Sequence, residues 1–268
     1  MVKNWRLILD DDGDGCFNMA ADEAILFCYP ECKTPTLRIY GWSSPWVTLG
    51  FSQNSRRVIN PGCRVPFVRR ITGGSAIYHY LEITYSLVFS ANDLDMTASV
   101  KESYAKLALF LLNFYARLGI KGEFAYSCVP EKVRPAGNFC FSSCEHFDII
   151  IDNKKIGGNA QRRRRAMIFQ QGSIPFRLDR PSIAMAITDC GYLSDTADLE
   201  ELTKVNRGAG ELKKILAQSF SETFDVDLRL SGYNPNEISC FRALITEKYN
   251  TTDWNCEGKI HEKAAVAG

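Results

Sequence analysis

The sequence predicts an α+β fold: a mainly antiparallel sheet flanked by helices, with a small helical C-terminal part. Strand-like segments dominate residues 5–176, and one long helix pattern, at 99–118, lies among them. After Pro181 the pattern becomes helical. Strands followed by helices are typical of α+β proteins, whereas a doubly wound sheet needs regular alternation. We expect a core domain over 1–180 and a helical extension over 181–268 packed on it, the alternative being two separate domains divided near Asp179.

The first third of the chain predicts one helix and several strands. Residues 5–10 alternate like a strand, and residues 17–29 form a helix pattern that we expect to stop at Pro30. Two β-rich runs, 36–42 and 46–51, flank a Ser-Ser-Pro turn and predict a hairpin. Further strands are predicted at 65–71 and 77–90.

The remaining elements follow from caps and turns. Ser99 and Glu102 form a capping box that opens the long helix, and Gly119 marks its end. Asn234 before Pro235 opens the last helix, which we expect to run to about Tyr249. The other predicted elements are a short strand at 122–127, a strand meander at 147–152, 155–162 and 168–176 with its turn at Asp152-Asn153, a helix at 211–224, and a frayed tail at 261–268.

Composition sets limits on the class of protein. The chain has 268 residues, 46% hydrophobic and 24% charged, with a net charge of +1, which suits a globular protein without a global field toward nucleic acid or membranes. No apolar run approaches the ~18 residues of a membrane span, and no leader pattern is visible. The ten cysteines include no Cys-x-x-Cys pair and no zinc-site spacing. We expect a cytoplasmic protein with mostly buried, inert thiols and no metal site.

Two glycine pairs are candidate ligand-binding segments. Thr72-Gly73-Gly74-Ser75 lies between two strand runs and follows Arg69-Arg70. Glycines allow a ligand to approach the backbone, and arginines can bind a phosphate or carboxylate, although the glycines alone favour a plain glycine hairpin with surface arginines. Lys155 precedes Gly157-Gly158. A lysine there can polarise an acyl carbonyl or lower the pKa of a thiol, and its alternative is a solvated turn.

Three further features allow both a functional and a structural interpretation. Cys140 lies between two phenylalanines and is a nucleophile only if a cation or base lies beside it; otherwise it is a packed thiol. Ser173, in Gln170-Gln171-Gly172-Ser173, is a candidate polar contact or an ordinary strand residue. Arg162–Arg165 is either a docking surface for an acidic carrier domain or a solvated strand edge.

Taken together, in this order and spacing, the segments resemble one family, the cofactor transferases that include lipoate ligases, octanoyltransferases and biotin ligases. The similarity runs from about Trp5 to Phe176, and within the group it is greatest to the LipM-type octanoyltransferases. The segments that carry it are 17–24, 37–42, 48–53, 69–79, 155–161 and 171–174.

The resemblance implies roles for individual residues. Cys140 falls at the position of the cysteine that carries the acyl group as a thioester, and Lys155 at that of the lysine that lowers its pKa. Departures from the family pattern are Ser75 for a third glycine, Tyr80 for an aspartate, Gln171 for a histidine and Asn159 for a serine. The substrate-binding residues implied are Arg70, Thr72, Gly73, Gly74, Ser75, Tyr78, His79, Gly157, Gly158, Asn159, Ala160, Gln161, Gly172 and Ser173.

The function implied is transfer of octanoyl from acyl carrier protein, through a cysteine thioester, to a lysine of a lipoyl domain. The acceptor would be a glycine cleavage H protein or a 2-oxoacid dehydrogenase subunit, and the enzyme a monomer that needs no cofactor. Alternatives are an ATP-dependent lipoate–protein ligase, an amidotransferase between lipoyl domains, and a non-enzymatic acyl-carrier binding protein. We also expect segments 72–75 and 157–161 to lie side by side at one elongated pocket, with Ile77 and Ala160 lining an acyl tunnel.

Overall fold

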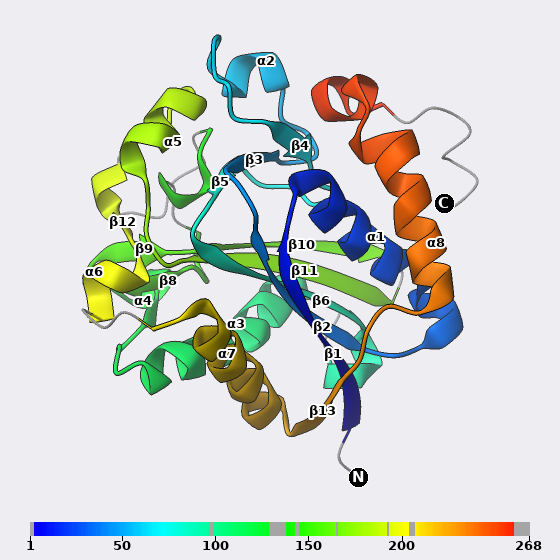
Figure 1. Ribbon diagram of the computed structural model, residues 1–268. Coiled ribbons are helices and arrows are strands. Elements are labelled where there is room, and N and C mark those ends of the chain that lie inside the picture. Colours follow the sequence, from blue (N-terminus) through cyan, green and yellow to red (C-terminus); the bar gives the residue numbers. More distant parts are fainter. Residues whose placement is uncertain are drawn as a thin grey trace.

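The computed structural model describes residues 3–96, 99–128, 138–142, 145–164, 166–191, 193–203 and 207–259. Its centre is a six-stranded sheet in which the first four strands are antiparallel neighbours and β1 is parallel to both of its neighbours (Figure 1). The predicted α+β fold with a mainly antiparallel sheet is confirmed. In spatial order the strands are β10 (Gly158–Arg164), β11 (Met167–Pro175), β6 (Glu82–Ser90), β2 (Thr36–Trp42), β1 (Lys3–Gly13) and β13 (Val226–Leu230).

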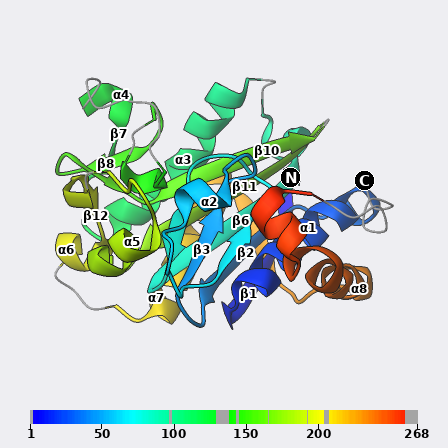
Figure 2. The ribbon, with the colours of Figure 1, turned by 90° about the horizontal axis from the view of Figure 1, so that it is seen from above.

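Helices cover both faces of this sheet. On one face α3 (Val100–Arg117) packs against α7 (Ala209–Phe224), and on the other α1 (Gly15–Cys32) packs against α8 (Pro235–Leu244), a pair that lies side by side in both views (Figure 1 and Figure 2). Both predicted helix starts are present: Ser99 Oγ accepts the backbone N–H of Glu102, which is one half of the predicted capping box, and Asn234 and Glu237 form a reciprocal capping box.

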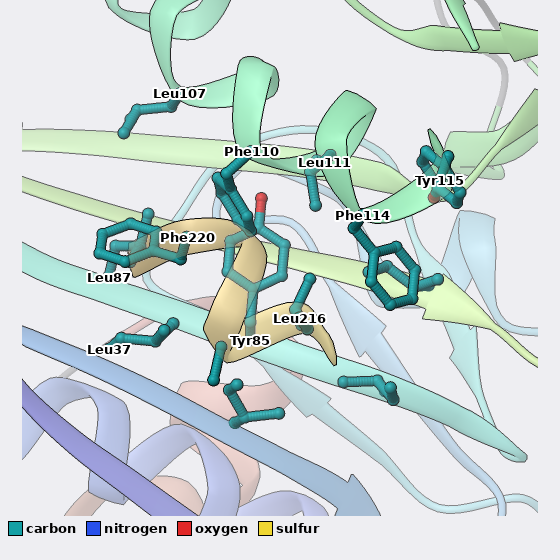
Figure 3. Close-up of a cluster of buried hydrophobic side chains, with 14 of the residues drawn as sticks. Leu37, Tyr85, Leu87, Leu107, Phe110, Leu111, Phe114, Tyr115, Leu216 and Phe220 are labelled. Carbon is teal, nitrogen blue, oxygen red and sulfur yellow. The ribbon is translucent and has the colours of Figure 1, made fainter. Parts of the chain in front are cut away.

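The larger core cluster lies between the sheet and the α3–α7 pair. Phe110 and Phe114 of α3 and Phe220 of α7 meet Tyr85 and Leu87 of β6 (Figure 3). Phe110 packs edge-on against Tyr85, with ring centroids 5.1 Å apart. Burying each of these aromatic side chains stabilises the fold by roughly 2–3 kcal/mol, and this face therefore anchors the sheet.

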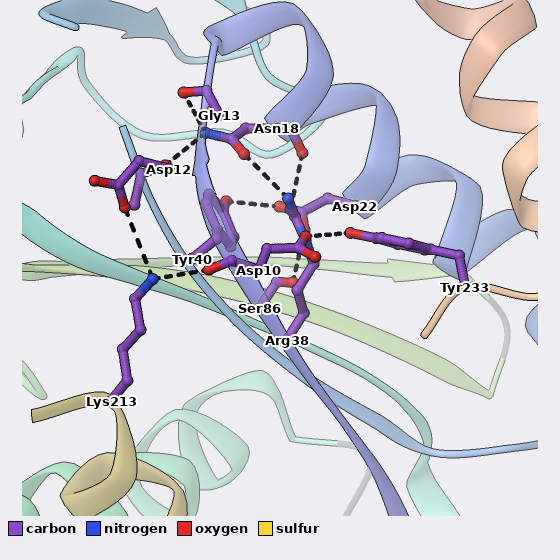
Figure 4. Close-up of polar contacts among 11 residues, drawn as sticks. Asp10, Asp12, Gly13, Asn18, Asp22, Arg38, Tyr40, Ser86, Lys213 and Tyr233 are labelled. Atoms are coloured by element: carbon purple, nitrogen blue, oxygen red, sulfur yellow. Dashed lines mark hydrogen bonds and ion pairs between the residues drawn. The ribbon is translucent and has the colours of Figure 1, made fainter. Parts of the chain in front are cut away.

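A buried polar cluster joins α1 to the opposite face. Arg38 of β2 donates to Asp22 and to the side-chain oxygen of Asn18, both on α1, and pairs with Asp10 of β1 (Figure 4). Tyr40 donates to the second oxygen of Asp22. Because a buried charge is tolerated only when it is paired, this cluster fixes the position of α1 on the sheet.

The predicted hairpin at 36–51 is wrong. β3 (Trp46–Leu49) does not return along β2 but enters a separate three-stranded sheet with β4 (Phe67–Arg69) and β5 (Ile77–His79). The predicted strand 77–90 is also divided, because Leu81 adopts a φ of 52° between β5 and β6. The strands that precede these two breaks, β2 and β5, are buried throughout. Hydrophobicity alone therefore did not reveal where the chain changes sheet.

Pro30 does not end the first helix. α1 continues to Cys32, and Lys33 then takes a left-handed conformation. The missing N–H of a proline removes a single helical hydrogen bond, and Pro30 lies near the helix end, so the loss is small.

A third sheet has the order β12 (Thr196–Ala197), β9 (Lys154–Ile156), β8 (Ile149–Ile151), β7 (Glu123–Phe124). Asp152 and Asn153 have positive φ and turn β8 into β9, as predicted. The predicted meander nevertheless changes sheets, because Gly157, at a φ of 70°, directs the chain from β9 into β10. The short helices are α2 (Ser55–Val58), α4 (Ala125–Cys128), α5 (Arg180–Ala186) and α6 (Leu199–Thr203).

The C-terminal part is more than a helical extension. β13 pairs with β1 and extends the central sheet, and α8 continues as a π-helical segment, Ile245–Tyr249. The side chain of Arg69 of β4 connects segment 254–256 to the loop after β3. Its guanidinium donates to the carbonyl oxygens of Trp254, Asn255, Cys256, Gly50, Phe51 and Gln53. None of the helices that the structure describes is long and apolar enough to cross a membrane. The predicted tail 261–268 lies outside the described residues.

Candidate active site

Cys140 lies between the two predicted glycine segments. It begins a 3-10 turn, Cys140–Ser142, and its backbone N–H donates to the carbonyl oxygen of Ala76 at 2.9 Å, directly after the first glycine segment. A Cβ added at Gly158 would lie 3.0 Å from the sulfur of Cys140. The thiol therefore contacts the start of β10, where glycine leaves room for it, and the backbone of Cys140 adjoins the end of the first segment.

Lys155 is not a solvated turn residue. Its side chain is 5% exposed, and its ammonium nitrogen lies 2.7 Å from a carboxylate oxygen of Asp148. The same nitrogen donates to the backbone carbonyl oxygen of Cys140 at 2.9 Å. The ammonium thus joins the Cys140 turn to the β8–β9 hairpin and places a positive charge beside the cysteine.

Opposing effects act on the pKa of the Cys140 thiol. Burial raises the pKa above its ordinary value, and this effect is the largest. The positive charges of Lys155 and Arg70 lower it, whereas the carboxylates of Asp148 and Glu145 raise it. The cations that a reactive thiolate needs are therefore present, but the pKa of the thiol in the free protein remains raised.

Arg70 shapes the first glycine segment from within. Its side chain is fully buried, and it donates to the carbonyl oxygens of Gly73 and Ser75 and to the hydroxyl of Thr72. It also donates to Thr48 of β3. Burial lowers the pKa of Arg70 to about 10, so it stays a cation at neutral pH. The structure thus places Arg70 as the support of the loop.

The loop has room on its outer side. Gly74 has a φ of 86°, and its carbonyl oxygen lies so near Gly50 that a Cβ there would clash with it. A Cβ added at Gly73 would meet no atom within 4 Å. Gly74 is therefore needed for the turn, and Gly73 is the position at which a ligand can approach the backbone.

His79 is buried in a chain of hydrogen bonds. Its ring stacks on Trp42 with centroids 4.0 Å apart, Nδ1 lies 2.7 Å from a carboxylate oxygen of Glu82, and Nε2 lies 2.8 Å from Thr48 Oγ1. Ser173 donates to the other oxygen of Glu82 at 2.6 Å. Glu82 therefore links β5 to β11 through His79 and Ser173.

Strand alternation divides the second glycine segment. Gly158 and Ala160 lie on the face of β10 that carries Cys140. Asn159 and Gln161 lie on the α3 face, where Asn159 accepts the hydroxyl of Tyr85 and Gln161 accepts that of Ser103. Only part of the predicted set therefore surrounds the thiol.

Three other predicted residues are placed as follows. A Cβ at Gly157 would lie 2.3 Å from the carbonyl oxygen of Ser173, so this glycine allows the chain to cross between sheets. A Cβ at Gly172 would clash with Asn159 and the ring of Tyr85 on the α3 face. Tyr78 belongs to the buried cluster that includes Phe139 and Ile183, on the opposite side of β5 from His79.

The arginine run lies on β10, an edge strand of the central sheet. Arg162 donates to the carbonyl oxygen of Ile71 and lies over the ring of Phe51, and Arg164 is exposed. Arg163 points to the other face and donates to Ser99 and Ser103. Arg162 and Arg164 therefore continue the face that carries Gly158 and Ala160, and Arg165 lies outside the described residues.

Sequence reasoning missed the acids of the site. Asp148 precedes the β8–β9 hairpin, and Lys155 follows its turn. Opposite charges on the two sides of a predicted hairpin were the sequence signal that could have indicated this ion pair. Glu82, a lone acid at the start of an apolar strand, was the corresponding signal for the His79 chain. Gln171 was noted only as a departure from the family pattern.

Among the described residues no group of histidine, cysteine and acidic side chains could hold a metal ion. A cavity of about 400 Å³ lies beside α6 and α7, and its wall includes Leu212 together with Trp42 and Glu82, which contact His79. The sequence prediction of an elongated pocket at the glycine segments remains a prediction.

Comparison with known proteins identifies the family of this chain. A family model of the lipoyl protein ligase A/B catalytic domain matches residues 14–221. The chain is 30% identical to an octanoyltransferase LipM of Kyrpidia tusciae, over 95% of this chain and 99% of the relative, and 27% identical to that of Bacillus subtilis, over 94% and 98%.

Solved structures agree with the fold. A lipoate-protein ligase A bound with ATP superposes with a TM-score of 0.80 at 23% identity, covering 94% of this chain and 98% of the other. A bi-partite lipoate protein ligase from Thermoplasma acidophilum gives 0.77 at 22% identity, over 94% and 96%. The chain belongs to the lipoyl protein ligase A/B catalytic domain family.

Proposed function

We propose that this protein is an octanoyltransferase of lipoate biosynthesis, which moves octanoyl from acyl carrier protein to a lysine of a lipoyl domain through a thioester on Cys140. The observation that carries the proposal is that the Cys140 sulfur lies against Gly158 and that the ammonium of Lys155 donates to the carbonyl oxygen of Cys140. Relatives named octanoyltransferase LipM match nearly the whole chain.

The first step exchanges one thioester for another. The thiolate of Cys140 attacks the carbonyl carbon of the octanoyl thioester, a new C–S bond forms and the old one breaks, and the carrier thiol leaves with the proton that Cys140 gave up. Lys155 and Arg70 favour the thiolate electrostatically. The open backbone at Gly73 offers the incoming thioester an approach to the loop.

The second step forms an amide. The neutral ε-amine of the acceptor lysine attacks the thioester carbon, a C–N bond forms, the C–S bond breaks, and the proton of the amine returns the cysteine to its thiol form. A thioester is already an activated acyl group, so neither step needs ATP or another cofactor.

The carrier would dock at the edge of β10. Arg162 and Arg164 share the face of the strand that leads to Cys140, and Arg164 is exposed. An acidic carrier would be steered toward such a surface by long-range charge attraction.

The test of the function is the dependence of transfer on ATP. We expect purified protein to move octanoyl from its carrier protein to a lipoyl domain without ATP, as followed by the mass of the acceptor. A protein that turns over only with ATP and free acid is a ligase instead, and this result would overturn the proposal.

A further inference from the structure

Two buried side-chain polar atoms among the described residues have no hydrogen-bond partner: Trp5 Nε1 and Gln171 Oε1. Trp5 lies among the rings of Phe89 and Phe220 in the larger core cluster. Gln171 lies instead on a central strand beside the candidate active site. An unpaired buried acceptor destabilises the protein that carries it, and a reactant that donates a hydrogen bond can supply the missing partner.

Strand register places Gln171 on the side of β11 that faces Cys140. Gln171 lies opposite Ala160, and Ser173 lies opposite Gly158, the residue against which the Cys140 sulfur packs. Residues directly opposite in an antiparallel pair share a face, and diagonal neighbours such as Gly158 and Gln171 are about 7–8 Å apart. A glutamine side chain spans much of that distance.

The neighbouring side chains on this face are already occupied. Ser173 donates to Glu82, and Ser86, which lies opposite Gln171 on β6, donates to Asp22. Ala160 has no polar side-chain atom. Arg162, the other neighbour on this face of β10, donates to the carbonyl oxygen of Ile71, and the Gln171 oxygen has no hydrogen-bond partner among the described residues.

We infer that Gln171 is a positioning residue that accepts a hydrogen bond from an N–H group of a reactant at the Cys140 thioester. The octanoyl chain and the thioester have no such donor. The attacking ε-amine does, and so do amide groups of the arm that carries the thioester. The first source fits the chemistry, because a hydrogen bond from one N–H to Gln171 directs the amine's lone pair toward the carbonyl carbon.

This inference rests on the proposed function and is tested by separating its two steps. Gln171→Met keeps the length of the side chain and removes the acceptor. Loading of Cys140 from octanoyl carrier protein is followed by intact mass, and transfer from the loaded enzyme to a lipoyl domain by single-turnover kinetics. The matched control is Gln170→Met, because Gln170 lies on the opposite face and its amide is paired with Tyr85 and Gln161.

We expect Gln171→Met to transfer about tenfold more slowly, to load at the wild-type rate, and to unfold at a higher temperature, because an unpaired buried acceptor has been removed. Gln170→Met should unfold at a lower temperature with both rates unchanged. Gln171→His, which keeps an acceptor nitrogen, should recover transfer above the pKa of its ring.

Slower loading with unchanged transfer supports the acceptor role but identifies the arm of the donor as the N–H source. Wild-type rates in both steps overturn the inference, as does an equal loss in both steps with a lower unfolding temperature, which indicates a structural role. If the wild-type protein itself takes up no octanoyl, the proposed function has failed and the inference falls with it; a defect confined to Gln171→Met leaves the proposed function intact.

Discussion

The ammonium of Lys155 lies 2.7 Å from the carboxylate of Asp148, and both side chains are largely buried. This pair changes what a substitution of Lys155 tests. A lysine in a solvated turn could be replaced with little effect on folding, whereas Lys155 is the buried partner of an acid.

Lys155→Met should therefore destabilise the protein by about 3–5 kcal/mol, because it leaves the Asp148 carboxylate buried without its partner. Chemical denaturation measures the free energy of unfolding directly. The double variant Lys155→Met/Asp148→Leu should recover much of the lost stability. A single variant as stable as the wild type would show that the pair is not held as the structure describes.

The same double variant tests the electrostatics of the thiol. Burial raises the pKa of Cys140, and Lys155 lowers it, so the rate of loading should rise about tenfold per pH unit through neutral pH as the thiolate fraction grows. Asp148 opposes Lys155, so removing both charges should shift the profile less than Lys155→Met does. The rate of alkylation of Cys140 as a function of pH, measured for the wild type, Lys155→Met and the double variant, checks the relative size of the two shifts. Identical profiles for all three proteins contradict this expectation.

Gly158→Ala should block the site sterically. The added Cβ would lie 3.0 Å from the Cys140 sulfur and 3.1 Å from the ring of Phe141, so the thiol must move. We expect loading to fall at least about tenfold, since small displacements of a nucleophile cost large factors in rate. Gly210→Ala in α7, where a Cβ meets no atom within 4 Å, is the control and should load normally. Equal loading by both variants would place the reacting sulfur elsewhere.

Reversal of a charge at the edge of β10 should weaken carrier docking. Arg164→Glu should raise the KM for octanoyl carrier protein by about fivefold at low salt, and the effect should shrink as salt screens the charges. Arg229→Glu, on β13 at the opposite edge of the sheet, is the matched control and should leave KM unchanged. Steady-state kinetics at two ionic strengths decide this, and equal KM values for the two variants would exclude docking at β10.

Local signals predicted much of the fold correctly. Ser99, Asn234 and the Asp152-Asn153 turn are chemical features that act within a few residues, and each appears in the structure as expected. The changes of sheet at Leu81 and Gly157 were not predictable in this way, because alternation of side chains looks the same whichever strand lies alongside.

The arrangement of the candidate site residues also depends on contacts that local signals do not reveal. Resemblance selected Cys140 and Lys155 as candidate catalytic residues, and the structure joins them through a hydrogen bond. The resemblance could not show that Asn159 faces α3 while Ala160 faces the thiol, because the direction of each side chain depends on the strand register. The partner of Lys155, Asp148, also depends on tertiary contact and left only a weak trace in the sequence.

The central claim, that Cys140 carries the acyl group, is tested most directly by the intact mass of the protein after incubation with octanoyl carrier protein in the absence of ATP. We predict one added octanoyl group that hydroxylamine removes, present in a Cys63→Ser control and absent from Cys140→Ser, because a serine hydroxyl stays protonated and is a far weaker nucleophile. If Cys140→Ser still transfers octanoyl to a lipoyl domain at nearly the wild-type rate, the thioester mechanism is wrong.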